Sequence, residues 1–239
     1  MSLNPSPSNT SEAKRLFTDF DGPIMDVSER YFRVYQLCLD KVKQPDQVVT
    51  PLSKAEFWAL KRSQVPEIEI AIKSGLLESG QSKTFAQLRR EIVHTEPYFQ
   101  YDCIIEGAIA ALEKAQQAGV ELAVMTMRRV RELEPVLEKY NLERFFPPSH
   151  RFCLSNDYIK TGDTKDKPKL MERAIATLSP VKYQWMVGDT EADIIAGKSF
   201  NVTTIGILSG IRDQTQLELH QPSLIHPNLM SAVEIVLNS

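Results

Sequence analysis

The sequence has no apolar run long enough to span a bilayer, and few of its 239 residues are cysteine or histidine. Its three cysteines (Cys38, Cys103 and Cys153) are scattered and odd in number. This argues against a disulfide framework and favours a reducing, cytoplasmic compartment. The four histidines lack the paired spacing of metal ligands. The net charge of −3 lacks the basic excess of nucleic-acid binders. We therefore expect neither a membrane nor a nucleic acid as partner.

The overall composition is that of a folded protein, and the pattern along the chain predicts a core with an insert. Hydrophobic residues make up 42% and charged residues 25% of the chain, which is ordinary for a globular protein. The length allows one large domain, or a core with a smaller insert. Residues 1–14 are rich in Ser, Pro and Asn and lack the apolar stretch of a signal peptide, which predicts a disordered tail. Residues 27–103 carry apolar side chains at helical spacing, which predicts a helical insert.

The flanking segments, 15–26 and 104–239, alternate strand-like apolar runs with helical patterns and are expected to form one core. After the first run, which begins at residue 15, strands are predicted over 120–125, 152–154, 183–187 and 202–208. Helices are predicted over 107–118, 129–140, 167–178, 191–199 and 229–237, the second broken at Pro135. This alternation predicts an α/β fold, a Rossmann-like doubly wound parallel sheet. Such sheets bind ligands beyond the carboxyl ends of their strands, where Asp19, Asp21, Thr126 and Asp189 are expected to converge.

Two aspartates, Asp19 and Asp21, end the first apolar run, and Gly22 and Pro23 then stop the strand. Side chains alternate along an extended chain, so the two carboxylates point the same way. Crowded carboxylates repel and hold a proton between them unless a cation is present. Mg²⁺ is a natural partner, because it takes one or two carboxylates and keeps positions for waters and a phosphate. The plain alternative is a strand end with an Asx turn.

Four motifs, taken together and in order, resemble those of the haloacid dehalogenase-like (HAD) hydrolases. They are Asp19-Phe20-Asp21-Gly22, the strand ending in Thr126, Lys167-Pro168, and Gly188-Asp189-Thr190-Glu191-Ala192-Asp193. The helical insert lies where this family places its type-1 helical cap. The resemblance implies a HAD core with an inserted cap, of the phosphoglycolate phosphatase-like branch. Asp21 argues against the dehalogenase branch, whose leaving halide needs no proton.

The resemblance implies a role for each acidic motif residue. Asp19 would attack phosphorus and form an aspartyl-phosphate. Asp21 would protonate the leaving oxygen and then take a proton from water. Mg²⁺ would be held by the Asp19 carboxylate, the Asp21 backbone carbonyl and Asp189. Asp193 lies one helical turn after Asp189, where it would orient the motif lysine or hold a metal-bound water.

The same resemblance implies that Thr126 and Lys167 bind the phosphate. The Thr126 hydroxyl would hold phosphate oxygens, although a strand-end threonine without function is the plain alternative. Lys167 would supply a positive charge to the phosphate. Surface lysines are common, so nearby lysines compete with it: Lys165 first, and Lys160 and Lys169 at longer odds.

Substrate choice falls to the cap. Trp58, Lys61 and Arg62 place an aromatic ring beside two cations, which is a candidate site for a small anionic or sugar-like leaving group. The alternative is a packed helix whose cations reach into water. We expect a magnesium-dependent phosphatase that acts on a small-molecule phosphate ester, as a monomer or homodimer.

Two other functions stay open at this point. A β-phosphoglucomutase-like phosphomutase would use the same acids but return the phosphoryl group to a sugar. A degenerate, non-catalytic family member would serve as a binding or regulatory module. Retention of both first-motif acids, Thr126, a Lys-Pro pair and Asp189 argues against the second of these.

Overall fold

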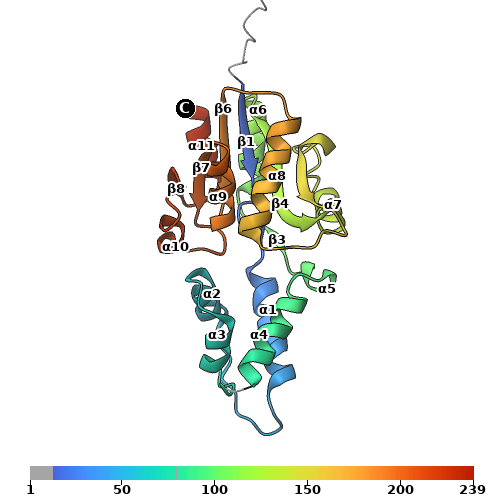
Figure 1. Cartoon of the computed structure of the whole chain (residues 1–239), viewed down its shortest axis with the longest axis vertical. Coiled ribbons are helices and arrows are strands. Elements are labelled where there is room, and N and C mark those ends of the chain that lie inside the picture. Colours follow the sequence, from blue (N-terminus) through green and yellow to red (C-terminus); the bar gives the residue numbers. More distant parts are fainter. Residues whose placement is uncertain (1–12, 79) are drawn as a thin grey trace, which may run out of the picture.

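A six-stranded parallel sheet forms the centre of the larger part of the computed structural model, which describes residues 13–78 and 80–239 (Figure 1). The strand order is β5-β4-β1-β6-β7-β8, and each neighbouring pair is parallel. The strands are β1 Lys14–Thr18, β4 Glu121–Arg129, β5 Arg151–Leu154, β6 Tyr183–Gly188, β7 Thr203–Ile207 and β8 Leu224–His226. The chain runs from β1 outward to β4 and β5, then returns past β1 to β6. The predicted doubly wound sheet is confirmed.

Both faces of the sheet are covered by helices, so successive strand residues enter different cores. Leu16 of β1 packs into the core under α6, α7 and α11, whereas Phe17 packs into the core under α8 and α9. Both side chains are fully buried, which explains why the strands read as continuous apolar runs. These helices are α6 Ala108–Gln117, α7 Val130–Lys139, α8 Asp163–Thr177, α9 Glu191–Ser199 and α11 Leu229–Asn238.

Five helices within residues 28–99 of the described chain pack together apart from the sheet (Figure 1). They are α1 Ser28–Val42, α2 Lys54–Arg62, α3 Glu67–Lys73, α4 Gln81–Ile92 and α5 Glu96–Phe99. Stacked and edge-on rings of Tyr35, Phe57 and Phe85 fill their own core. The chain enters these helices through β2 (Met25–Asp26) and leaves through β3 (Cys103–Ile104), and the two pair antiparallel. Such short strands carry no periodicity, so the sequence did not reveal them.

Two helices contain a proline where the sequence predicted an interruption or a start. α7 continues through Pro135, its sixth residue. α8 begins at Asp163 rather than at Lys167, so Pro168 is also an interior residue. A proline this close to a helix start removes its own N–H donor and crowds only one carbonyl of the first turn. Packing of the inner helix face outweighs this local cost.

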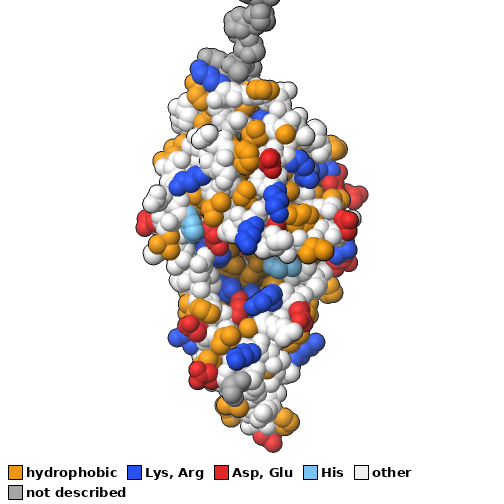
Figure 2. Space-filling view, in the orientation of Figure 1, with side chains coloured by type: hydrophobic (Ala, Val, Ile, Leu, Met, Phe, Trp, Pro, Cys, Tyr) orange, Lys and Arg blue, Asp and Glu red, His pale blue; other side chains and the backbone are white. Residues whose placement is uncertain are grey.

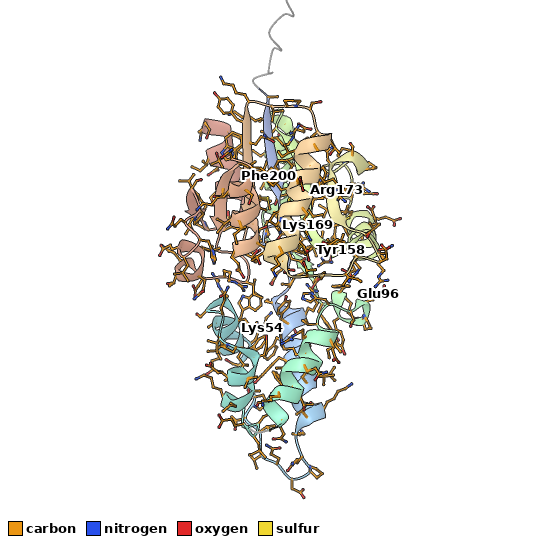
Figure 3. All side chains as sticks on the ribbon, viewed as in Figure 1. Lys54, Glu96, Tyr158, Lys169, Arg173 and Phe200 are labelled. Carbon is orange, nitrogen blue, oxygen red and sulfur yellow. The ribbon has the colours of Figure 1, made fainter. Side chains whose placement is uncertain are left out.

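The early start of α8 follows from the side chain of Asp166. Its carboxylate accepts hydrogen bonds from the N–H groups of Thr161 at 2.7 Å and Gly162 at 3.2 Å, just before the helix. Tyr158 and Lys169, labelled in Figure 3, donate to the same carboxylate at 2.9 and 3.0 Å. The buried acid thereby fixes the chain that leads into the helix, as N-terminal capping does.

Other boundaries differ from those predicted. β1 begins at Lys14, which was assigned to the tail, and residues 1–12 of that tail lie outside the described residues. β4 continues through Thr126 to Arg129, so this threonine lies within the strand. β8 and the short helix α10 (Gln214–Glu218) were not predicted. In the described part of the chain, no helix combines the length and apolarity needed to cross a membrane.

Candidate active site

The predicted site residues meet at the carboxyl ends of three neighbouring strands. β1 lies between β4 and β6, Asp19 directly follows β1, and Asp189 directly follows β6. The Asp19 N–H donates to the Val187 carbonyl at 2.8 Å, which joins the two strand ends. Thr126 lies in the part of β4 where the register against β5 shifts. Such irregularities re-aim side chains near active sites, and this edge is where parallel sheets bind ligands.

Asp19, Asp189 and Asp193 form a cluster of buried carboxylates around one lysine. One oxygen of each lies within 4.8 Å of the others. Lys167 Nζ lies 2.6 Å from Asp19 Oδ2 and also contacts Asp193 Oδ1. The second oxygen of Asp193 accepts from the N–H and hydroxyl of Thr190, at 3.0 and 2.7 Å, and so caps α9. In this geometry Asp193 holds the lysine toward Asp19.

Lys167, rather than Lys165, is the lysine of this cluster. The Lys167 side chain is 1% exposed, whereas Lys165 lies on the exposed side of α8. Lys160 is also exposed, and Lys169 pairs with Asp166. Burial alone would lower the pKa of Lys167, but the Asp19 and Asp193 carboxylates raise it above the ordinary value. The lysine therefore stays charged.

The carboxylate cluster carries more negative charge than its lysine neutralises. Burial, reinforced by the Asp193 carboxylate, raises the pKa of Asp189 to about 7. Burial also raises the pKa of Asp19, against the opposing effect of Lys167. Unpaired charge is costly away from water. An all-oxygen donor set with excess buried negative charge fits a divalent cation such as Mg²⁺.

Two glycines allow the backbone to approach Asp189 closely. Gly22 adopts φ +94°, and a Cβ there would overlap the Asp189 carboxyl group. A Cβ at Gly210 would overlap the same carboxyl group from the loop after β7. The N–H of Ile211 in that loop donates to Asp189 Oδ2 at 2.6 Å. The glycine of the first motif therefore brings the Asp19 loop against Asp189.

Asp21 is bound by two arginines. Arg128 donates to Asp21 Oδ1 from Nε at 3.0 Å and from Nη2 at 2.7 Å, and Arg30 Nη2 lies 3.4 Å from Oδ2. Burial alone would raise the pKa of Asp21, but Arg128 and then Arg30 lower it to about 2. Both arginines also pair with buried Asp102, at 2.5 and 2.9 Å. Burial raises the pKa of Asp102 to about 6.

The sequence analysis missed this arginine pair and Asp102. Arg128 lies two residues after Thr126, and an extended strand turns both side chains to the same side. That spacing was a usable signal. Arg30 and Asp102 lie at opposite ends of the helical segment, and no local pattern connects them.

A cavity of about 340 Å³ lies between the sheet and the helical segment, and Figure 2 shows the hollow where the two parts meet. The sheet side of its lining includes Asp19, Asp21, Thr126, Lys167 and Asp189. The helical side includes Tyr31, Lys61, Glu67, Arg89 and His94. The predicted catalytic and phosphate-binding side chains therefore open onto one space that the helices partly cover.

Of the three residues predicted to recognise the substrate, one is among the described residues of the cavity wall and two are not. Lys61 lines the cavity, and Trp58 and Arg62 are absent from the described residues that line it. Trp58 packs edge-on against Tyr31, with ring centroids 5.9 Å apart. Arg62 donates to the Arg212 carbonyl at 3.1 Å. Helix α2 thus presents only the lysine to the cavity, because its tryptophan packs within the helical segment.

The family model described as haloacid dehalogenase-like hydrolase matches residues 13–201. The chain belongs to this family. The resemblance drawn from the four motifs is confirmed, and the protein is a HAD-like hydrolase. The matched segment contains the Asp19 loop, Thr126, Lys167 and the Asp189 loop.

Relatives of this HAD-like hydrolase include phosphatases from several bacteria. It is 22% identical over 218 residues to a phosphoglycolate phosphatase of Pseudomonas fluorescens, covering 90% of this chain and 76% of the relative. It is 23% identical over 229 residues to pyrophosphatase PpaX of Listeria monocytogenes, covering 95% and 98%. A solved HAD-like hydrolase from Streptococcus pneumoniae shares the fold, with TM-score 0.65, 16% identity and coverage of 94% and 98%.

Proposed function

We propose that this HAD-like hydrolase is a magnesium-dependent phosphatase that acts on a small phosphorylated metabolite. One observation carries the proposal. Asp19 is held 2.6 Å from the buried Lys167 ammonium, on a cavity wall that Thr126 and Asp189 share. A carboxylate, a fixed cation and a hydroxyl around one space are the groups that phosphoryl transfer needs. The names of the relatives support cleavage of a phosphorus–oxygen bond.

In the first proposed step, an Asp19 oxygen attacks phosphorus while the bond to the leaving oxygen breaks, and an aspartyl-phosphate results. The Phe20 N–H donates to Asp19 Oδ1 at 2.7 Å and holds the carboxylate in place. Lys167 and the Thr126 hydroxyl donate to the phosphoryl oxygens, where negative charge must be stabilised. Most of the rate enhancement then comes from positioning and from fixed charge.

In the second step, Asp21 takes a proton from a water that attacks phosphorus, the bond between phosphorus and the Asp19 oxygen breaks, and inorganic phosphate leaves with the Asp19 carboxylate restored. Arg128 and Arg30 hold Asp21 as a carboxylate, which is the form that this step requires. The first step needs the protonated form, because Asp21 must give a proton to the leaving oxygen. We therefore propose that the pair between Asp21 and Arg128 loosens in the substrate complex.

Asp19 and Asp189 would hold Mg²⁺, together with the Asp21 backbone carbonyl that the family resemblance implies. Bound Mg²⁺ neutralises crowded acids and offsets the phosphate charge. We propose that residues 27–103 act as the cap, because their helices form the opposite wall of the cavity.

Phosphate release from a panel of esters and anhydrides, with Mg²⁺ present, tests this function. Asp19→Asn should lose at least ~1,000-fold in kcat, as nucleophile variants do. Asp40→Asn is a matched control, because Asp40 lies on α1 with 69% of its side chain exposed. Turnover surviving in Asp19→Asn would identify a wrong nucleophile. Absence of turnover in wild type would favour a phosphomutase, detectable by sugar-phosphate isomerisation, or a binding module.

A further inference from the structure

Arg89, on α4, is a buried arginine with unused hydrogen-bond donors at the cavity wall. The residue is 4% exposed and lines the cavity. Its Nη1 donates to Glu67 Oε1 at 2.6 Å, but Nε and Nη2 have no hydrogen-bond partner among the described residues. Guanidinium groups stay charged, and buried donors are nearly always paired. The guanidinium of this cavity-lining residue therefore keeps hydrogen-bonding capacity that its described neighbours do not use.

The charges beside Arg89 leave it incompletely neutralised. Lys61 pairs with the same Glu67 oxygen that Arg89 binds, so one carboxylate serves two cations. The other Glu67 oxygen is buried and has no hydrogen-bond partner within the described chain. Arg212 also lines the cavity, but Glu191 binds its Nε and Nη2 at 2.8 and 2.9 Å. The helical wall therefore offers positive charge at the buried Arg89 and the half-buried Lys61, beside the exposed Arg90 of the same helix as Arg89.

Two aromatic rings hold the Arg89 guanidinium in place. Its central carbon lies 4.9 Å from the Tyr31 ring centroid and 5.9 Å from that of Phe57. Cation–π contacts of this kind restrain the plane of the guanidinium without using its N–H groups. The donors of Arg89 are thus fixed before a ligand binds, which lowers the entropy cost of binding.

We propose that Arg89 binds a second anionic group, carried by the leaving group of the substrate. The preferred substrates are then small phosphate compounds with a carboxylate or a second phosphate. A guanidinium matches either group through paired N–H···O bonds. This inference rests on the proposed function, because the phosphate that is cleaved would occupy the Asp19 and Lys167 side of the same cavity. The cavity of about 340 Å³ suits a small metabolite.

The test compares matched substrates in wild type and Arg89→Gln. Phosphoglycolate and pyrophosphate carry the second anion, whereas ethylene glycol monophosphate replaces the carboxylate with a neutral hydroxyl. Arg89→Gln should lower kcat/KM for the anionic substrates by roughly 10- to 100-fold, mainly through KM, and for the neutral ester by less than ~3-fold. Arg33→Gln is the control and should change neither, because Arg33 is 55% exposed on α1. The anionic substrate with the higher kcat/KM shows whether Arg89 binds a carboxylate or a phosphate.

Arg89→Lys provides a second variant that keeps the charge but lacks the planar fork, and it should regain part of the preference for anionic substrates. An unchanged preference in both variants, or an equal loss on anionic and neutral substrates, would overturn the inference. Calorimetric binding of phosphoglycolate to Asp19→Asn, with and without Arg89→Gln, separates this inference from the proposed function. If wild type hydrolyses nothing, the function fails. Weaker binding on loss of Arg89 would still support the second anion site, and equal or absent binding would refute it.

Discussion

Replacing Asp189 with asparagine should stabilise the metal-free protein above neutral pH while it abolishes activity. Burial and Asp193 raise the pKa of Asp189 to about 7, against about 3.9 in an unfolded chain. A carboxyl group whose folded pKa is raised favours the folded state below the unfolded value, and this advantage is lost as pH rises through the folded value. Three pKa units correspond to ~4 kcal/mol.

Part of this free energy is shared with Asp193, so we expect Asp189→Asn to gain ~2–4 kcal/mol at pH 8. The asparagine side chain keeps an oxygen for the Ile211 N–H, which now donates to Asp189 at 2.6 Å. The gain therefore reflects the removed charge and not a lost hydrogen bond. Below the unfolded pKa, the wild-type carboxyl group is neutral as well, and the two proteins should converge in stability.

Urea denaturation in a chelator, at pH 8 and at pH 4.5, measures the free energy of unfolding under both conditions. The free energy of unfolding of Asp189→Asn should exceed that of wild type by less than ~1 kcal/mol at pH 4.5. Added Mg²⁺ should stabilise wild type at pH 8 and leave Asp189→Asn nearly unchanged, because bound metal replaces the missing positive charge. Asp40→Asn serves as an exposed control. An Asp189→Asn protein that is no more stable than wild type at pH 8 without metal would refute this reasoning.

Three further variants test other parts of the site. Lys167→Met should lower kcat/KM at least ~1,000-fold, whereas Lys165→Met on the exposed side of α8 should stay within ~2-fold; equal losses in steady-state assays would contradict the assignment. Gly22→Ala should abolish Mg²⁺ binding in calorimetry, because its methyl group would overlap Asp189; wild-type affinity would disprove the close approach. Asp166→Asn should cost ~2–4 kcal/mol at pH 7. Burial raises the pKa of Asp166, but its hydrogen bonds outweigh burial and lower the pKa below the ordinary value. The loss of stability in Asp166→Asn should therefore shrink as pH falls below the pKa of the unfolded chain. Equal losses at pH 7 and pH 3 in urea denaturation would argue against this role of Asp166.

The positions of Asp19, Thr126 and Asp189 at one sheet edge were determined by the sequence itself. Each follows or lies in an apolar run, and helical patterns separate the runs, so the strands must be parallel and their carboxyl ends must meet. Helices between the first and second predicted strands could likewise be predicted, because residues 27–103 repeat apolar side chains at helical spacing. The spacing of apolar residues and the order of the segments along the chain are enough for both predictions, since neither depends on contacts between distant residues.

Only the tertiary structure decided which charged side chains act together. Lys167 and Lys165 lie in one helix, and the rotation of α8 against the sheet buries the first and exposes the second. Asp102 meets Arg30 where β2 and β3 pair, at the two chain ends of the helical segment. Arg89 matters because it lines the same cavity as Asp19, from the helical segment. Such partnerships join segments far apart in the chain, and their geometry depends on how packed helices are rotated, which one-dimensional periodicity does not encode.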